Sequence, residues 1–388
     1  MTAGFNKLPI AAATGGLIFV AWSAFTEGSG FEGAGAKLFL ATLIGGFAGF
    51  SLYHASFGFT AGWRRIISES RSTGLRAQFL LIALSALCSY PLIEYWGANA
   101  WVHPMSVAMV VGAFLFGMGM QFGGGCGSGT LFVVGGGSTR MVITLTFFII
   151  GSMLGVVHLQ YWRSLPDFGR YSLINAFGSF YAFVILLVIL AFLAFLAAWW
   201  EKRVHGSLEQ PRRTGSFLLG PWSPWTGAVA LAIVSVATLV VLNRPWGITQ
   251  AFGLWGAKIS YFAGVSTDSW LLAPWPDRAF ERSVFLNATS VMDFGIILGA
   301  MIAAGLAGKW APVWSLSRRE VATAVIGGLL MGYGARLSYG CNIGAYLGGL
   351  VSGSMHAWVW ALAAFGGSSL VVWFRMPRLP NAPQNVPS

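Results

Sequence analysis

Two cysteines in this sequence lie in glycine-rich segments whose residue types favour anion binding. The first cysteine segment, residues 122–132, reads FGGGCGSGTLF, and the second cysteine segment, residues 336–349, reads RLSYGCNIGAYLGG. Each fits a glycine turn followed by a helix N-terminus, where unpaired N–H groups and a partial positive charge attract anions. A thiol adds a weak S–H donor and a soft, polarisable surface. The pattern therefore indicates a site for a soft anion that contains sulfur.

Polar and glycine residues beside the two thiols complete the candidate site. Ser128 and Asn342 add hydrogen-bonding groups, and Arg336 places a charge within apolar sequence, where charged residues are functional by default. Structural filler is the competing interpretation for the cysteines, which are often buried, and snorkelling to the membrane surface is the competing interpretation for Arg336. The predicted substrate-binding residues around the thiols are Gly125, Cys126, Gly127, Ser128, Arg336, Gly340, Cys341 and Asn342.

The cysteine pattern does not indicate an enzyme or a metal centre. The three cysteines form no Cys-x-x-Cys or Cys/His spacing, and neither Cys126 nor Cys341 has a general base beside it in the sequence. Cys88 has no glycine-rich surroundings, so we interpret it as filler. We expect no catalytic residue, no metal and no cofactor, and the sequence contains no phosphate-binding loop of an ATPase.

The composition places both segments inside a membrane. Of 388 residues, 56% are hydrophobic and only 9% are charged, whereas soluble proteins carry roughly 25% charged residues. Stretches of about 20 apolar residues can cross a bilayer. The plainest stretches are 8–25, 38–53, 77–93, 141–159, 173–200, 226–242, 291–308 and 357–374. The sequence therefore predicts an all-α, polytopic integral membrane protein.

Three further segments begin as apolar helices and are then interrupted. Residues 105–135 and 321–351 break into glycine, and residues 245–263 resemble a half-helix. Lipid cannot satisfy the backbone polar groups at such a break, so breaks persist only where protein or a watery cavity covers them. We therefore expect broken or re-entrant helices that meet near the midplane of the membrane.

We interpret the net charge of +11 as a sign of how the protein is oriented in the membrane rather than of nucleic-acid binding. Most Lys and Arg residues border the spans in four stretches, 64–76, 202–213, 309–319 and 375–378. By the positive-inside rule we assign these to the cytoplasm, with the lipid bilayer rather than nucleic acid as the partner. The acids assigned to the outer side are Glu27, Glu32, Glu94, Asp167, Asp268, Asp277 and Glu281. Asp293, near the start of a span, is a candidate helix cap or a partner for Arg336.

The chain also carries an internal repeat. Placing Cys126 over Cys341 aligns Gly112, Gly117, Gly119, Gly125 and Gly129 with Gly327, Gly332, Gly334, Gly340 and Gly344. FGFT at 57–60 pairs more weakly with WGIT at 246–249. We predict repeat halves at 1–200 and 225–375, a basic cytoplasmic linker at 201–224 and a disordered tail at 376–388. Transporter repeats are inverted or parallel; the sequence leaves both open, and we expect inverted repeats.

These motifs resemble those of the YeeE/YedE family of bacterial membrane proteins. GMGMQFGGGCGSGT and GYGARLSYGCNIGAYLGGL, the latter followed by MHAW, resemble two cysteine motifs of the family. GFTAGWRR at 58–65 resembles the family motif CFTSAFRD, with Gly58 in place of its cysteine.

The resemblance implies uptake of thiosulfate, or of a related sulfur or selenium species, across the bacterial inner membrane by an hourglass-shaped protein of inverted repeats. Cys126 and Cys341 would be relay points that pass the anion on by S–H hydrogen bonds. Gly58 leaves a three-cysteine relay incomplete, and His54 and Ser56 are candidates for the missing contacts. A cytoplasmic sulfur-carrier protein is a further partner that the resemblance implies.

Two other functional classes compete with a permease. In the first, Cys126 or Cys341 would accept sulfur as a persulfide and deliver it to a cytoplasmic protein. In the second, the protein would be a membrane scaffold or sensor without transport. The scaffold explains neither the paired broken helices nor Arg336.

Overall fold

The structure, a computed structural model, describes residues 5–30, 33–267, 272, 275 and 278–375. Within these residues, ten helical stretches are long and apolar enough to cross a membrane. Each predicted span coincides with one of them, although the predicted span 291–308 ends two residues beyond its helix, which ends at Leu306. The predicted all-α, polytopic membrane fold is therefore confirmed. The residues of the sequence-based predictions that lie outside the described part are Glu32, Asp268, Asp277, Arg378 and the tail 376–388.

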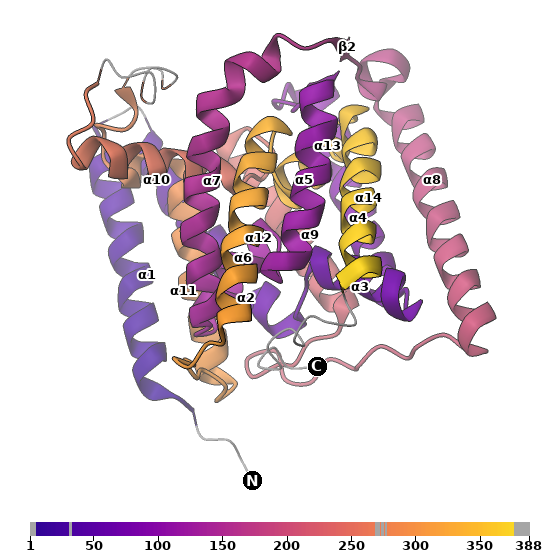
Figure 1. Ribbon diagram of the computed structural model, residues 1–388, viewed down its shortest axis with the longest axis horizontal. Coiled ribbons are helices and arrows are strands. Elements are labelled where there is room, and N and C mark those ends of the chain that lie inside the picture. The colour runs from indigo at the N-terminus through magenta and orange to yellow at the C-terminus, as the bar shows by residue number, and fades with distance from the viewer. Residues whose placement is uncertain (1–4, 31–32, 268–271, 273–274, 276–277, 376–388) are drawn as a thin grey trace.

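Seven of these spans consist of one helical element each (Figure 1). They are α1 (Lys7–Gly28), α4 (Thr73–Trp96), α7 (Thr139–Arg163), α8 (Leu173–His205), α9 (Pro224–Leu242), α11 (Ala288–Leu306) and α14 (His356–Arg375). One of them, α8, is kinked at Gly178, whose φ is 77°. Three spans contain a break. They consist of α2 (Ala34–Ala55) with α3 (Phe59–Glu69), α5 (Val107–Gly123) with α6 (Gly127–Gly135), and α12 (Arg318–Leu337) with a π-helical turn η3 (Asn342–Leu347) and α13 (Gly348–Leu350).

The remaining elements are short. Helix α10 (Thr249–Phe262) and the 3-10 turn η2 (Val284–Leu286) lie between α9 and α11, and β1 (Pro104–Ser106) pairs antiparallel with β2 (Asp167–Arg170). Local sequence sets several helix starts. Ser317 and Glu320 form a capping box at α12, and Ser223 caps α9, where Pro224 follows.

Close glycine contacts hold α5 against α12. A Cβ atom on Gly112 would lie 2.7 Å from the carbonyl oxygen of Gly334, and one on Gly119 would lie 2.9 Å from that of Gly327. Only glycine allows backbones to approach this closely. In the repeat alignment, Gly327 corresponds to Gly112 and Gly334 corresponds to Gly119. Each glycine of α5 therefore contacts the counterpart of the other one.

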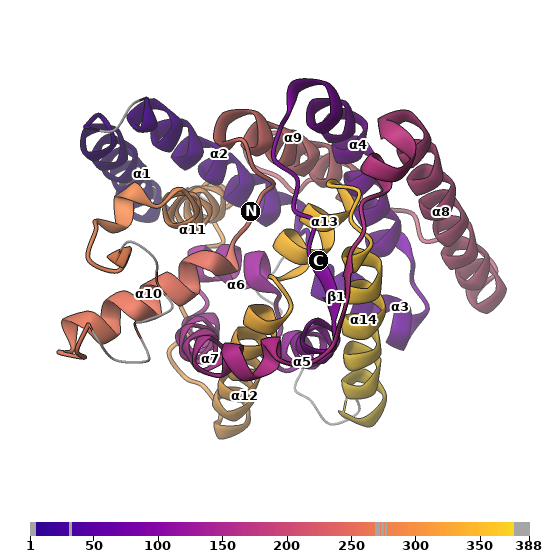
Figure 2. The ribbon, with the colours of Figure 1, turned by 90° about the horizontal axis from the view of Figure 1, so that it is seen from above.

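Figure 2 shows the short helices α6 and α13 in the middle of the protein, surrounded by longer helices. In Figure 1 the basic connections between α8 and α9 and between α11 and α12 lie on the same side as the start of α1 and the end of α14. We call this side the basic face. Strand β2 and the ends of α1 and α10 lie on the other side, the opposite face.

The basic linker is tied to the body of the protein by buried and bidentate contacts. Helix α8 runs to His205, so the first five residues of the predicted linker 201–224 are helical. Glu201 is fully buried and accepts hydrogen bonds from Ser72, at 2.5 Å from its hydroxyl, and from the backbone N–H of Glu209, at 2.8 Å. Arg65 donates two hydrogen bonds to Glu209, at 2.9 and 3.1 Å, and this guanidinium lowers the pKa of the carboxyl.

Candidate functional site

Cys126 lies at the N-terminus of α6, directly after the glycine turn that ends α5. Gly124 has a φ of 85°, a left-handed conformation that favours glycine. The thiol of Cys126 accepts a hydrogen bond from the N–H of Gly129 at 3.4 Å and lies 3.4 Å from the hydroxyl of Ser128. Because Cys126 is only 1% exposed, this polar helix start faces protein and not lipid.

Cys341 occupies the corresponding place before η3. It is fully buried, and Gly340 before it has a φ of 148°. The side-chain amide of Asn342 is buried too, and neither its oxygen nor its nitrogen has a hydrogen-bond partner in the described part of the chain. Buried polar groups without partners are rare, so the amide of Asn342 is available to a polar ligand.

The two cysteine segments meet at Gly127. A Cβ atom added to Gly127 would lie 2.9 Å from Sγ of Cys341 and 3.4 Å from the methyl carbon of Thr249. The thiols of Cys126 and Cys341 are close enough to interact electrostatically. Gly127 therefore leaves the space into which the second thiol projects, and Thr249, at the start of α10, borders the same point.

A cavity of about 170 Å³ lies beside Thr249, toward the opposite face. Its lining includes His103, Arg163, Thr249, Gln250, Arg336 and Tyr339. His103 stacks on Tyr339 with ring centroids 4.4 Å apart, and burial lowers the pKa of His103 to about 4. Since His103 is neutral at pH 7, the positive charge of this cavity comes from its two arginines, which suits an anion.

A second cavity, of about 530 Å³, lies on the basic face. Its lining includes Ser56, Gly58, Ala61, Arg65, Glu209 and Arg212. Phe59, next to Gly58, contacts the ring of Tyr346 in η3, with centroids 6.2 Å apart. Thr249 lines the first cavity, and Gly58, the neighbour of Phe59, lines the second. The cysteine turns therefore have one cavity on the side of Thr249 and the other on the side of Phe59.

A family model described as Sulphur transport matches residues 54–370, which include both cysteine segments. The chain belongs to this family. The family and its curated relatives are transporters, not enzymes.

Curated relatives carry two names. The chain is 31% identical over 174 residues to the Salmonella typhimurium protein named "Probable transporter YedE", covering 42% of this chain and 41% of that one. The chain thus spans about two fifths of the length of its YedE relatives. It is 27% identical over 287 residues to the thiosulfate transporter TsuA of Spirochaeta thermophila, covering 70% of this chain and 78% of TsuA. TsuA of Escherichia coli is 24% identical over 335 residues, covering 81% of this chain and 87% of TsuA.

Within this member of the Sulphur transport family, Gly58 lines the cavity on the basic face. Its φ of −133° is extended backbone, which any residue adopts, and a Cβ atom there would meet only ordinary contacts, the nearest being Ala61 at 3.7 Å. The conformation therefore does not require glycine. Ser56 lines the same cavity, whereas His54 packs against Phe50, with centroids 4.4 Å apart.

Arg336 points into the cavity on the opposite face. Its guanidinium carbon lies 5.2 Å from the ring centroid of Trp275, and its Nε has no hydrogen-bond partner among the described residues. Asp293 is neither a helix cap nor a partner of Arg336, the two roles that its sequence position indicated. The cap of α11 is Asn287, whose side chain accepts the N–H of Ser290, and the charge near Asp293 is Arg244, not Arg336. Neighbouring helices, not the local sequence, decide which charges meet.

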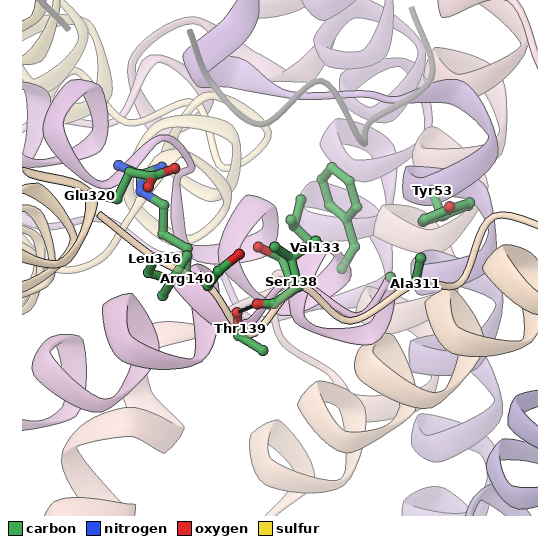
Figure 3. Close-up of a pocket in the computed structure, with 12 residues that line it drawn as sticks. Tyr53, Val133, Ser138, Thr139, Arg140, Ala311, Leu316 and Glu320 are labelled. Atoms are coloured by element: carbon green, nitrogen blue, oxygen red, sulfur yellow. Dashed lines mark hydrogen bonds between the residues drawn. The ribbon is translucent and has the colours of Figure 1, made fainter. Parts of the chain in front are cut away.

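Arg140 and His356 have local partners. Arg140 donates to the carbonyl of Phe122 at the end of α5, at 2.8 Å, and Figure 3 shows it beside Glu320 in a small cavity of about 90 Å³ on the basic face. His356 lies 2.6 Å from the hydroxyl of Ser354 through Nδ1. Neither residue borders the point where the cysteine segments meet.

Sequence reasoning missed Thr249, His103 and Tyr339 as parts of the site. A signal for Thr249 was present, because it ends the WGIT motif that pairs with FGFT at 57–60. His103 and Tyr339 carried no such signal, since their ring stacking depends on how β1 approaches the end of α12.

Proposed function

We propose that this protein is a transporter of the bacterial inner membrane that imports a sulfur-containing anion, with thiosulfate as the leading candidate. One observation carries the proposal: Sγ of Cys341 lies against Gly127, beside Cys126, between two cavities on opposite faces. Thiosulfate is also the anion after which the TsuA relatives are named.

The anion passes from the first cavity to the second without covalent chemistry. Arg336 and Arg163 attract it, and the thiols of Cys341 and Cys126 bind it in turn. The free amide of Asn342 and the hydroxyl of Ser128 supply further hydrogen bonds, and the turns at Gly125 and Gly340 place the thiols. Thiol hydrogen bonds are weak, and a transport site must release what it binds.

The two halves are inverted repeats. The glycine contacts between α5 and the antiparallel helix α12 support this. Gly112 contacts Gly334, which aligns with Gly119, and Gly119 contacts Gly327, which aligns with Gly112. Other helix contacts also come in pairs that the repeat interchanges. The contact of α2 with α11 corresponds to that of α9 with α4, and the contact of α5 with α14 corresponds to that of α12 with α7. A two-fold axis within the membrane plane relates such pairs.

Uptake of radiolabelled thiosulfate by a bacterial strain without its own importers tests the function. The variants Cys126→Ala and Cys341→Ala are expected to slow uptake about tenfold each, because each removes a hydrogen-bonding group from the pathway. Cys88→Ala is the control, since Cys88 is exposed on the surface of α4. Absence of uptake by wild-type protein present in the membrane would refute thiosulfate as the substrate, and competition by selenium and other sulfur anions on the same cells would follow.

Gly58→Cys tests whether a third thiol fits the pathway. We expect the variant to fold and to transport thiosulfate at the wild-type rate or up to about tenfold faster, because the new thiol would lie in the basic-face cavity without a clash. Uptake and the melting temperature in detergent measure the two effects. A melting temperature well below that of wild type would show that the position needs glycine after all.

Mass spectrometry distinguishes a transporter from the alternative persulfide carrier. After exposure to substrate, intact-protein mass spectrometry of a carrier would show an added sulfur atom at Cys126 or Cys341. We expect an unchanged mass, because a transported anion leaves both thiols intact.

A further inference from the structure

Asp293 is a buried acid that the proposed pathway does not use. It lies on the membrane-spanning helix α11 and is completely shielded from water. Neither carboxyl oxygen has a hydrogen-bond partner within the described part of the chain. An ionised carboxylate in such a place is costly, and it takes up a proton instead. Acids within membrane spans are rare and mark ion or proton pathways.

Arg244 lies near Asp293 but its hydrogen bonds go elsewhere. The guanidinium of Arg244 donates to Thr289 at 2.9 Å and to Gln250 at 3.2 Å. Thr289 is one helical turn from Asp293, and the arginine interacts with the acid electrostatically without forming an ion pair. This arrangement leaves Asp293 free to be neutral, with a positive group within reach when it ionises.

The surroundings of Asp293 favour a proton over a metal ion such as sodium. A bound cation needs several oxygen ligands, but the neighbouring hydroxyl groups are engaged. Ser290 accepts a hydrogen bond from Trp255 at 2.9 Å and donates to Asn287 at 3.0 Å, and Thr289 accepts from Arg244. Among the described residues, the nearby hydroxyl groups of Thr289 and Ser290 are thus already hydrogen-bonded, whereas a proton needs only the carboxyl itself.

The elements packed on α11 present few other titratable groups to Asp293. In addition to Arg244, the thiol of Cys341 is close enough to interact with the carboxyl, and Cys126 is the N-cap residue of α6. The remaining groups lie at the ends of their helices or bind elsewhere: Lys7 and Glu27 on α1, Lys37, Tyr53 and His54 on α2, Lys258 and Tyr261 on α10, and Arg282 before η2.

Asp293 is also connected to the proposed pathway. Gln250, a partner of Arg244, lines the cavity on the opposite face together with Thr249, which borders Gly127. An anion at Cys341 would repel a carboxylate at Asp293 but would tolerate the neutral acid. Binding of the anion and binding of a proton therefore favour one another, and such coupling is reciprocal.

We propose that Asp293 carries a proton that enters with each imported anion, a proposal that rests on the transport function proposed above. The carboxylate takes up one proton when the anion reaches Cys341 and releases it when the anion leaves, so no other bond forms or breaks. Import of an anion against a negative-inside potential costs about 2.3 kcal/mol per charge per 100 mV. A proton that travels inward with the anion offsets one of these charges.

Proteoliposomes that contain the full chain test this coupling. With the membrane potential held at zero, radiolabelled thiosulfate should accumulate about tenfold for an inward gradient of one pH unit, if one proton accompanies each anion. Asp293→Asn should still exchange thiosulfate at equal pH but should lose this accumulation. Glu27→Gln removes an exposed acid from the end of α1 and should behave like wild type.

Each outcome decides the question. If wild-type protein exchanges thiosulfate but ignores the pH gradient, or if Asp293→Asn still accumulates it, the coupling inference is overturned and the transport function stands. Accumulation driven by a sodium gradient at equal pH also overturns the inference. Absence of any thiosulfate exchange by wild type overturns both proposals.

A second measurement on wild-type protein covers the case in which Asp293→Asn does not fold. Dicyclohexylcarbodiimide reacts with protonated carboxyl groups in apolar surroundings. We expect mass spectrometry to find the adduct on Asp293, with loss of accumulation driven by the pH gradient. An unmodified Asp293 under conditions that abolish this accumulation would overturn the role of this residue.

Discussion

Gly127→Ala is expected to lower thiosulfate uptake by about tenfold to a hundredfold while leaving the protein folded. The added methyl group would lie 2.9 Å from Sγ of Cys341, inside the contact distance of the two atoms. Overpacking at a tight site costs about 1–3 kcal/mol, and here it falls on the point where the two cysteine segments meet. The initial rate of radiolabelled uptake, normalised to protein in the membrane, measures the effect.

Gly344→Ala is the matched control. Gly344 follows Cys341 by three residues, as Gly129 follows Cys126, and its added methyl group would be no closer than 3.7 Å to Trp101. We expect uptake close to that of wild type. Equal uptake by Gly127→Ala and Gly344→Ala would mean that the anion does not pass between Gly127 and Cys341.

Gly299→Val is expected to destabilise the fold strongly, more than Gly127→Ala does. Gly299 on α11 packs directly on the backbone of Gly46 on α2, and a Cβ atom would overlap the carbonyl group of Gly46. Backbone atoms cannot move aside as a side chain can, so the two helices must separate. We expect a loss of about 3 kcal/mol or more, seen as a lower melting temperature and a smaller monodisperse fraction in detergent.

Gly15→Val controls for valine in a membrane helix. A Cβ atom on Gly15 meets nothing within 4 Å, because the residue lies on an exposed side of α1. We expect its melting temperature to match that of wild type. If both valine variants melted at the wild-type temperature, the close contact of α2 with α11 would not be important for stability.

Local sequence was sufficient to predict the class of the protein and the positions of its spans. The bilayer sets a minimum apolar length, and each stretch from 8–25 to 357–374 met it without reference to any other part of the chain. The breaks before Cys126 and Cys341 were also predictable, since glycine runs at membrane depth interrupt helices. Helix boundaries were less accurate: α8 continues to His205, because charged residues extend a helix beyond the apolar part that sequence reasoning recognises.

The partners of charged residues were not predictable in the same way. Asp293 looked like a cap or a partner of Arg336, yet Asn287 caps α11 and Arg336 lies beside Trp275. Charges within a membrane find partners according to which helices pack together. Such packing joins residues far apart in the chain, so spacing within one helix does not reveal it.

By itself the sequence determined that the protein spans a membrane through many helices, that two of its spans break at a cysteine, and that its glycines recur at one offset. Composition and spacing contain this information because hydrophobic length and backbone freedom are local properties. The tertiary structure alone decided that Cys341 reaches Gly127, that Thr249 borders this contact, and that Asp293 has no hydrogen-bond partner among the described residues. These are properties of helix packing, in which close glycine contacts set distances that no single segment specifies.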